Sequence, residues 1–583
     1  MLRGYRRAVR AAVPIVTAGA LIAGAVTPGS GIIASPASST DVEQGATAPE
    51  TGDYLVFYAP GRQGDALRAV QAGGGEVTGA DPRLGYVVAR GPGAAFATRV
   101  GADPSVAGVT ANRRVGSAAA LTSAQLAAAP ETLPILPAEV STGTAATAAV
   151  TSTAFAASAA GEPMAGRQWD MRMIGATPSG SYAKARGSKK VLVGIIDTGV
   201  DGSHPDIAAN FDRARSRNFV VDRPLDPKGK TLDGPCEYKG CKDPADVDDD
   251  GHGTHVAGTI GAPINGIGMA GVAPGVSLVN IRAGMDSGFF FLKPVLDALT
   301  YAGDAGIDVV NMSFFVDPWT FNCTNNPADS AAERQQQAGI ITGVQRALDY
   351  ARARGVTLIS ALGNESTDLG HPVTDESSPG YPEGSERKRT IDNSCVNVPA
   401  ESRGVISVSA VGPSKRKAWY SDYGTEQTDI AAPGGDPTDT GTALKGAARE
   451  ILGPAPTRAL KAQKLIDASG RPKTSAVLRE CHHGSCAYWQ YLSGTSMASP
   501  HAAGVAAILV SRFGKPGRGG LTLAPARVEK LLYATATRTP CPGTGSTRYA
   551  ATEETHVCAG GPAKNGFYGH GIVNAGRAAT TKG

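Results

Sequence analysis

Three short segments of this 583-residue chain carry side chains that can do acid–base and nucleophilic chemistry. Asp197 follows an apolar run, His252 begins the sequence His-Gly-Thr-His-Val-Ala-Gly, and Ser496 lies within Gly-Thr-Ser-Met-Ala-Ser-Pro-His. A serine hydroxyl becomes a strong nucleophile when a base takes its proton, and an imidazole can be that base near neutral pH. A carboxylate fixes the tautomer of the imidazole. Together, the three residue types predict a hydrolytic triad.

Each segment also has a simpler interpretation when it is taken alone. Asp197 could be a structural carboxylate at the end of a strand, and Ser496 could be the N-cap of a helix. His252 and His255 lie three residues apart and could share a metal ion, although the H-E-x-x-H pattern of zinc proteases is absent. Only the combination of the three segments favours catalysis.

Combined, the segments resemble the motifs of the subtilisin-like (subtilase) family of serine peptidases, in which the triad follows the chain order Asp, His, Ser. The resemblance covers about residues 166–580. It implies that Asp197, His252 and Ser496 are catalytic and that His255 is structural. It also implies that Asn364, in Ile-Ser-Ala-Leu-Gly-Asn-Glu, donates its side-chain amide to the oxyanion of acyl transfer, beside the Ser496 backbone N–H.

The same resemblance implies that the substrate binds as an extended strand between two segments of the enzyme. The predicted substrate-binding residues are Ser287, Gly288, Phe289, Ser313, Phe314, Phe315 and Gly363. Phenylalanines stand here where the family often carries small residues. Two interpretations remain open: the rings pack into the core, or they line the groove and narrow the specificity.

No cofactor is expected for the chemistry, but the family often binds Ca²⁺ as a structural ion. The residues that match parts of its calcium loop are Asp206, Asn265, Ile267 and Met269. Carboxylate, amide and carbonyl oxygens suit this hard cation. A ligand near the start of the catalytic region has no clear match. A second candidate is the acidic group Asp246, Asp248, Asp249 and Asp250, for which a solvated acidic loop is an equal alternative.

The elements that must position these residues alternate between strands and helices. Apolar runs at 190–196, 277–281, 309–312, 356–361 and 404–411 predict strands, and the segments 293–303 and 342–355 predict helices between them. Continuous Val/Ile runs are typical of a parallel sheet covered on both faces. The sequence therefore predicts an α/β fold with a doubly wound parallel sheet flanked by helices. Active sites of such sheets form at the carboxyl ends of the strands.

The chain divides into four predicted regions. Residues 1–37 have the basic, apolar and small-residue stretches of a signal peptide, and their apolar run is too short for a stable membrane anchor. Residues 53–115 predict a small α+β ferredoxin-like unit, which by position resembles the family's inhibitory propeptide; an unrelated accessory domain is the alternative. Residues 116–165 form an Ala/Thr-rich linker with the maturation cleavage. Residues 166–583 form the catalytic domain.

Composition supports an exported protein. The eight cysteines all lie after residue 235, and an even number in an exported chain indicates disulfides. Pairing the shortest loops gives Cys236–Cys241, Cys481–Cys486 and Cys541–Cys558, which leaves Cys323–Cys395. The net charge of +4 includes four arginines among the first ten residues, so the sequence has no electrostatic footprint for nucleic acid.

These observations predict a secreted serine endopeptidase made as a zymogen. It would act as a monomer on protein or peptide substrates, through an acyl-enzyme on Ser496, with its own propeptide as inhibitor. Two other hypotheses are a related Ser-Glu-Asp acid peptidase and a catalytically dead scaffold that binds peptides. His252 within its full motif argues against the first, and the four filled catalytic positions argue against the second.

Overall fold

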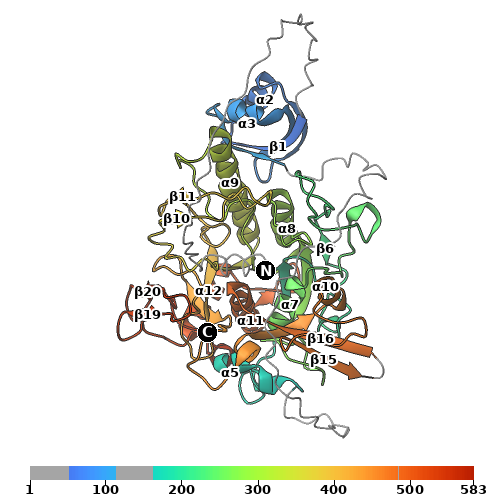
Figure 1. The fold of residues 1–583 in the computed structure, drawn as a ribbon, viewed down its shortest axis with the longest axis vertical. Coiled ribbons are helices and arrows are strands. Elements are labelled where there is room, and N and C mark those ends of the chain that lie inside the picture. The colour runs from blue at the N-terminus through green and yellow to red at the C-terminus, as the bar shows by residue number, and fades with distance from the viewer. Residues whose placement is uncertain (1–50, 113–161, 483–484) are drawn as a thin grey trace, which may run out of the picture.

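We describe a computed structural model of the chain, which covers residues 51–112, 162–482 and 485–583. The predicted signal peptide and almost all of the linker lie outside the described residues. Figure 1 shows a small N-terminal unit seated on a larger body. Among the described residues, no helix is both long and apolar enough to cross a membrane.

The larger body is built around a seven-stranded sheet in which every neighbouring pair of strands is parallel. The strand order is β13-β12-β9-β8-β5-β7-β6. The strands are β5 (Leu192–Ile196), β6 (Arg217–Asn218), β7 (Ser277–Arg282), β8 (Val309–Met312), β9 (Thr357–Ala361), β12 (Val405–Val411) and β13 (Ile430–Pro433). Every residue of β5, β8, β9 and β12 is buried, as expected of a parallel sheet that is covered on both faces. The predicted doubly wound fold is confirmed.

Helices cover both faces of the sheet. On one face, α7 (His252–Gly261) and α11 (Thr495–Phe513) share a core with Val193 and Ile195 of β5. On the other face, α8 (Leu292–Ala305) and α9 (Ala331–Ala353) share a second core with Leu192 and Ile196 of the same strand. The side chains of a strand alternate between its two faces, so β5 contributes to both cores.

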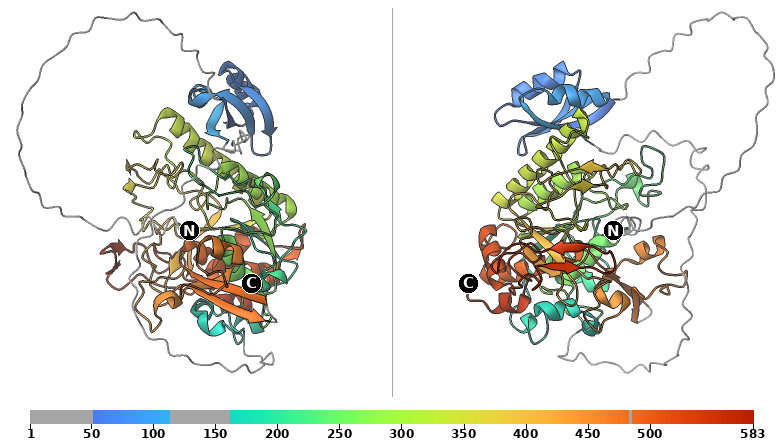
Figure 2. Two further views of the ribbon diagram at one scale, coloured as in Figure 1. Left: turned by 45° about the vertical axis from the view of Figure 1, so that its right-hand side comes forward. Right: turned by 60° about the vertical axis from the view of Figure 1, so that its left-hand side comes forward.

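The N-terminal unit is a four-stranded antiparallel sheet with two helices. It contains β1 (Thr51–Tyr58), α2 (Gln63–Ala72), β2 (Glu76–Asp81), β3 (Tyr86–Pro92), α3 (Gly93–Gly101) and β4 (Val106–Ala111). The sheet has the order β2-β3-β1-β4, and the elements follow one another as β-α-β-β-α-β. Figure 2 shows this unit above α8 and α9 in two further views.

Shorter elements complete the body. A hairpin sheet of β14 (Ile451–Ala455), β16 (Ser485–Leu492) and β15 (Val477–His482) leads into α11. The other helices are α5 (Trp169–Ile174), α6 (Pro205–Ala208), α10 (Thr457–Ala462), α12 (Pro525–Thr535) and α13 (Ala575–Thr580), with 3₁₀ turns η1 (Ala165–Arg167), η2 (Ser181–Ala183), η3 (Lys239–Cys241) and η4 (Gly446–Arg449). Short strand pairs are β10 (Thr374–Asp375) with β11 (Arg389–Thr390), β17 (Lys515–Pro516) with β18 (Leu521–Thr522), and β19 (Ser546–Arg548) with β20 (Thr555–Val557).

The cysteines pair as the sequence predicts. The disulfides are Cys236–Cys241, Cys323–Cys395, Cys481–Cys486 and Cys541–Cys558. Three of them close short local loops. Cys323–Cys395 joins two segments that are 72 residues apart.

Candidate active site

Asp197 directly follows β5, at the carboxyl end of a central strand, and its side chain is completely buried. Its Oδ1 accepts hydrogen bonds from the Nδ1 of His252 at 2.6 Å and from the Thr198 N–H at 2.8 Å. The backbone carbonyl of Asp197 accepts the N–H groups of Ala283 and Gly284. The carboxylate is therefore fixed in place and aimed at the imidazole.

His252 is the first residue of α7, and a neighbouring acid shapes the turn that carries it. Asp248 Oδ1 accepts the Thr198 hydroxyl and the Gly251 N–H, while its Oδ2 accepts the N–H and the hydroxyl of Thr254. Asp248 thus ties the start of α7 to the residue that follows Asp197. Sequence reasoning treated Asp248 as a candidate calcium ligand and missed this role.

Glycine is required at the second position of the His252 motif. A Cβ on Gly253 would lie 2.0 Å from the Gly199 carbonyl oxygen and 3.0 Å from the Asp197 Cβ. No side chain fits there, because both neighbours are too close for any Cβ. The absence of a side chain lets α7 approach the end of β5 closely enough for His252 to reach Asp197.

Two opposing effects set the proton affinity of His252. Burial lowers the pKa of its imidazole, whereas the charge of Asp197 and the hydrogen bond to it raise this pKa. The net pKa lies above the ordinary value for histidine. The Asp197 carboxylate stabilises the imidazolium that forms when His252 takes a proton.

Ser496 is the second residue of α11, where the first backbone N–H groups of a helix have no intrahelical partner. Its Oγ donates to the Ser313 carbonyl at 3.2 Å and makes no hydrogen bond with the His252 ring. Catalytic hydrogen bonds are often not yet formed in substrate-free structures. The hydroxyl must turn from Ser313 towards His252 before its proton can be transferred.

Asn364 lies three residues beyond β9, with the oxygen of its side-chain amide already occupied. Its Oδ1 accepts the Thr495 N–H at 2.9 Å and the Thr495 hydroxyl at 3.0 Å. These bonds orient the amide, so that its Nδ2 group is free to donate to a developing oxyanion. Thr495, which sequence reasoning did not assign, therefore links the start of α11 to Asn364.

A buried carboxylate holds the loop around Asn364. Asp422 Oδ1 accepts the N–H groups of Glu365 at 2.9 Å and Thr367 at 2.8 Å, and the Asp422 N–H donates to the Gly363 carbonyl at 3.0 Å. These contacts grip the chain on both sides of Asn364. Asp422 lies 58 positions away in the sequence and belongs to no recognised motif, so no sequence pattern could have identified it.

The second histidine of the α7 motif lies outside the triad. His255 Nε2 is 3.0 Å from the Ile451 carbonyl and 3.1 Å from the Gln490 carbonyl. Burial lowers its pKa to about 3, which keeps the ring neutral. His255 therefore ties α7 to the hairpin of β14 and β16.

The two predicted edges of the substrate groove differ in the structure. Phe314 and Phe315 make no backbone hydrogen bond within the described residues, so their N–H and carbonyl groups are free to pair with an extended peptide. The segment 287–289 is folded on itself instead: the Gly288 N–H donates to Met285, the Phe289 carbonyl accepts from Met285, and the Ser287 N–H donates to Asp233. These groups are therefore bonded within the chain, and substrate binding by Ser287, Gly288 and Phe289 stays a prediction.

Burial separates the aromatic residues near the groove. Phe289 and Phe291 pack with Tyr381 in one small core, and the rings of Phe290 and Phe314 stack with centroids 4.2 Å apart. Only Phe315 keeps a partly exposed side chain in this group. The core interpretation therefore holds for the buried rings, and Phe315 is the phenylalanine that can face a substrate.

The predicted calcium residues meet around a buried carboxylate. Asp206 Oδ2 accepts the N–H of Met269 and of the Trp489 indole, while its Oδ1 is buried without a partner. Glu162 supplies a second carboxylate at the 265–267 loop, and its Oε2 is also buried and unpaired. The two unpaired oxygens fit a cation. The Asn265 amide is already bonded to Ile267 and to the Pro205 carbonyl.

The acidic group before His252 does not act as one site. Asp246 pairs with Arg213, Asp248 is fully bonded, and Asp250 accepts the His252 N–H. Only Asp249 retains a buried carboxylate oxygen without a partner.

This fold and this site define a serine peptidase of the Asp-His-Ser type. The model of the family described as "Subtilase family" matches residues 188–580, which is more than half of the chain, and the chain belongs to this family. It is 28% identical over 328 residues to a thermophilic serine proteinase from Bacillus sp. (strain AK1). This alignment covers 56% of this chain and 54% of the relative. It is also 28% identical to subtilisin DY from Bacillus licheniformis, with 61% of this chain and 87% of that protein covered. The chain thus spans about half the length of the first relative and most of the second.

Solved structures agree with this fold. The epidermin leader peptide processing serine protease from Staphylococcus aureus has a TM-score of 0.54 and 20% identity, with 92% of this chain and 100% of that chain covered. Fervidolysin from Fervidobacterium pennivorans has a TM-score of 0.50 and 21% identity, with 93% of this chain and 62% of that chain covered. At these identities the likeness shows the fold alone.

Proposed function

We propose that the protein is a secreted serine endopeptidase, made as a zymogen, that hydrolyses peptide bonds through an acyl-enzyme on Ser496. The observation that carries this proposal is the 2.6 Å hydrogen bond between Asp197 and His252, two residues 55 positions apart that the fold brings together. Asn364 and the Ser496 N–H add an oxyanion site beside the nucleophile.

The geometry supports the following sequence of steps. His252 Nε2 takes the Ser496 proton as the Oγ attacks the carbonyl carbon of the substrate, and Asp197 stabilises the imidazolium. The oxyanion is bound by the Asn364 Nδ2 and the Ser496 N–H. His252 then gives its proton to the leaving amine, and the C–N bond breaks. A water molecule, deprotonated by His252, releases the acyl group and restores the Ser496 hydroxyl.

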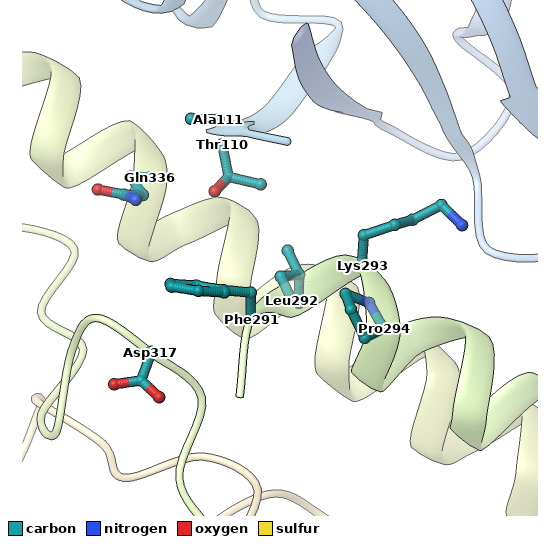
Figure 3. A pocket seen from close by; sticks show the side chains of 8 residues that line it. All are labelled: Thr110, Ala111, Phe291, Leu292, Lys293, Pro294, Asp317 and Gln336. Atoms are coloured by element: carbon teal, nitrogen blue, oxygen red, sulfur yellow. The ribbon is translucent and has the colours of Figure 1, made fainter. Parts of the chain in front are cut away.

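The N-terminal unit supports a zymogen. Leu55, Phe57, Leu84 and Tyr86 pack into one core with α8 and α9 of the catalytic body. Figure 3 shows the end of β4, at Thr110 and Ala111, beside Phe291 and the loop that carries Asp317. Phe291 and Asp317 each lie two residues beyond a predicted groove segment, the first ending at Phe289 and the second at Phe315. A chain that continues from Ala111 therefore starts next to the groove that it would block as an inhibitor.

Secretion and calcium binding complete the proposal. The predicted signal peptide at 1–37 and the four disulfides support export, because such bonds persist in oxidising compartments. The unpaired oxygens of Asp206 and Glu162 support a structural Ca²⁺ there. Such an ion would brace the 265–269 loop and has no part in the chemistry.

A serine-directed fluorophosphonate probe tests the assignment. The mature protein should be labelled on Ser496, and the Ser496→Ala variant should not be labelled and should keep its N-terminal unit uncleaved. Unlabelled mature protein, or equal labelling of Ser496→Ala, would falsify the peptidase assignment. Labelling of the full-length chain before cleavage would contradict only the inhibitory role of the N-terminal unit.

A further inference from the structure

A small unit built on the hairpin sheet packs against the helix that carries His252. This hairpin unit comprises β14, α10, β15 and β16, and it leads directly into α11. It has a core of its own, formed by the residues Ala455, Leu460, Ile466, Val477 and Tyr488. The unit is therefore a folded support and not a loose loop, and none of the roles described above uses α10.

The body of α7 lies closely on this hairpin unit. The His255 ring is within hydrogen-bond distance of one carbonyl of β14 and one of β16. A Cβ on Gly258 would lie 2.2 Å from Pro454 Cδ, and a Cβ on Gly453 would lie 2.5 Å from the His255 ring. No side chain fits at either glycine. These contacts fix the helix, but the first of them is made by its fourth residue, beyond His252 itself.

α10 reaches the turn in front of His252 (Figure 1). Gly251 has a φ of +98°, and a Cβ on it would lie 3.3 Å from Ala459 Cβ. Gln463, at the C-terminal end of α10, donates its Nε2 to the Asp250 carbonyl at 2.8 Å. Both contacts are therefore made with the two residues that directly precede the proposed base.

Asp250 transmits the contact of Gln463 to His252. Its backbone carbonyl accepts from Gln463, while its side-chain Oδ1 accepts the His252 N–H at 3.0 Å. This N–H is one of the first in α7, which have no partner within the helix. Gln463 thus fixes the backbone of the residue whose carboxylate anchors the start of α7.

A second contact of α10 with the same turn is weaker. Arg458 Nε is 3.0 Å from Asp249 Oδ1, and its Nη1 donates to the Tyr238 hydroxyl at 2.7 Å. The side chain of Arg458 is 48% exposed, and exposed ion pairs contribute little to a fixed geometry. Gln463 is half-buried and bonds the backbone, so it controls the turn more tightly than Arg458 does.

We propose that Gln463 is a positioning residue that acts through Asp250 to hold the His252 imidazole between Asp197 and Ser496. The proposal rests on the proposed peptidase function, in which His252 moves the proton. A displacement of about 1 Å at a reacting group can lower the rate on the order of 10²-fold. Because proton transfer to His252 occurs in the transition state, loss of the Gln463 contact should lower kcat and leave KM nearly unchanged.

Two variants of Gln463 test this role. Gln463→Glu keeps the size of the side chain but replaces the donor with an acceptor, and Gln463→Ala removes the side chain. In both, kcat should fall on the order of tenfold with little change in KM, because the hydrogen bond to the turn is lost. The midpoint of thermal unfolding should change little, since Gln463 lies outside the core of the hairpin unit. An unchanged kcat in Gln463→Glu would overturn the proposal, because the donor would then be dispensable.

Proton NMR of the Ser496→Ala protein gives a readout that does not depend on activity. The His252 Nδ1–H, which donates to Asp197 at 2.6 Å, should give a far-downfield resonance that is absent in Asp197→Asn. Adding Gln463→Glu should broaden or shift this resonance, and an unchanged resonance would contradict the proposal. If fluorophosphonate does not label Ser496 in the mature protein, the peptidase assignment fails on its own, whereas the resonance still shows whether Gln463 orders the imidazole.

Lys461→Ala is the matched control. Lys461 lies in the same helix, is exposed, and its side chain forms no hydrogen bond or ion pair within the part of the chain that the structure describes. This variant should leave both kcat and the resonance unchanged. Equal effects in Lys461→Ala would indicate general loosening of α10, and a raised KM with unchanged kcat in Gln463→Ala would indicate a role in substrate binding. Either result would rule out the positioning role.

Discussion

At the scale of residues, each reacting group is held by a side chain that does not itself react. Asp248 holds the turn of His252, Thr495 orients the amide of Asn364, and Asp422 holds the Asn364 loop. Four residues were assigned from short sequence motifs, which can be read directly from the chain: Asp197, His252, Asn364 and Ser496. Asp422 could not be predicted, because its partners are backbone N–H groups 55 to 57 positions away.

The raised pKa of His252 predicts where activity falls on the acidic side of the pH profile, which we call the acid limb. The neutral imidazole is the base, so activity falls as the pH drops through the raised pKa, above the ordinary value of about 6.5. Asp197→Asn removes the charge that raises the pKa and leaves burial, which lowers it. The limb should move to lower pH, while turnover falls on the order of 10⁴-fold because the tautomer is no longer fixed. A pH profile of kcat/KM checks both effects; an acid limb that does not move in Asp197→Asn contradicts the assignment.

Asp422 is predicted to position the oxyanion site. Asp422→Ala should lower kcat on the order of tenfold with little change in KM, since two hydrogen bonds that hold the loop are lost and the oxyanion forms only in the transition state. Asn364→Ala should lower kcat by about 10²–10³-fold, which is the magnitude measured for the loss of such a donor in a subtilisin. Asp422→Asn keeps an acceptor oxygen and should retain most of the activity. Equal losses in Asp422→Asn and Asp422→Ala, or a change confined to KM, would argue against a positioning role.

At the scale of elements, the apolar strands were predictable, and the contacts of the loops between them were not. The runs that became β5, β7, β8, β9 and β12 are apolar because both faces of the sheet are covered. α9 starts at Ala331, well before the predicted 342, although Ser330 and Glu333 form a capping box that marks its start. β2 was missed, because most of its residues are exposed or half-buried and it lacks an apolar run. The folded loop at 285–289 depends on Asp233, which only the tertiary structure brings near.

A buried arginine joins two loops of the catalytic body. Arg389 is fully buried and bonds Asp329 at 2.8 Å and Asp375 at 2.6 Å, both of which are also fully buried. Arg389→Met should destabilise the fold by about 3–5 kcal/mol, because Asp375 would lose its counter-charge inside the protein and Asp329 would keep only Arg387. Chemical denaturation of the Ser496→Ala protein measures this loss.

A surface pair is the control for this measurement. Arg403 pairs with Asp349, with 75% and 46% of their side chains exposed, so Arg403→Met should cost about 0–1 kcal/mol. Similar losses in the two variants would mean that burial of the Arg389 cluster has no special role.

At the scale of the whole molecule, the N-terminal unit and the catalytic body share a packed interface. The rings and aliphatic side chains of β1 and β3 face α8 and α9, and a Cβ on Gly343 of α9 would lie 2.6 Å from the Phe57 ring. A Cβ on Gly108 of β4 would likewise lie 2.5 Å from the Gly339 nitrogen. Such close backbone approach indicates a specific seat for the unit, which explains how a segment far from the triad in sequence could control access to it.

Arg346 of α9 gives the sharpest test of this seat. It donates to the Tyr58 carbonyl at 2.8 Å, the Gly85 carbonyl at 2.9 Å and the Leu84 carbonyl at 3.1 Å. Arg346→Ala removes all three hydrogen bonds from a charged donor. The inhibition constant of the cleaved unit should therefore rise on the order of tenfold or more. The kcat of the enzyme freed of the unit should not change, because Arg346 is outside the active site. The mixture of enzyme and cleaved unit is diluted after maturation, and the activity at each dilution gives the inhibition constant of the unit.

Arg352 of the same helix provides the comparison. It donates to the Gly404 carbonyl and to Glu529, which both belong to the catalytic body, so Arg352→Ala removes a charged donor from α9 without touching the N-terminal unit. It should leave inhibition unchanged even if it lowers stability. If the unit inhibits both variants with the same inhibition constant, the contacts of Arg346 do not hold the unit as an inhibitor. Weaker inhibition in Arg346→Ala alone would show that the bonds from Arg346 to the carbonyls of Tyr58, Leu84 and Gly85 hold the unit on the catalytic body as an inhibitor.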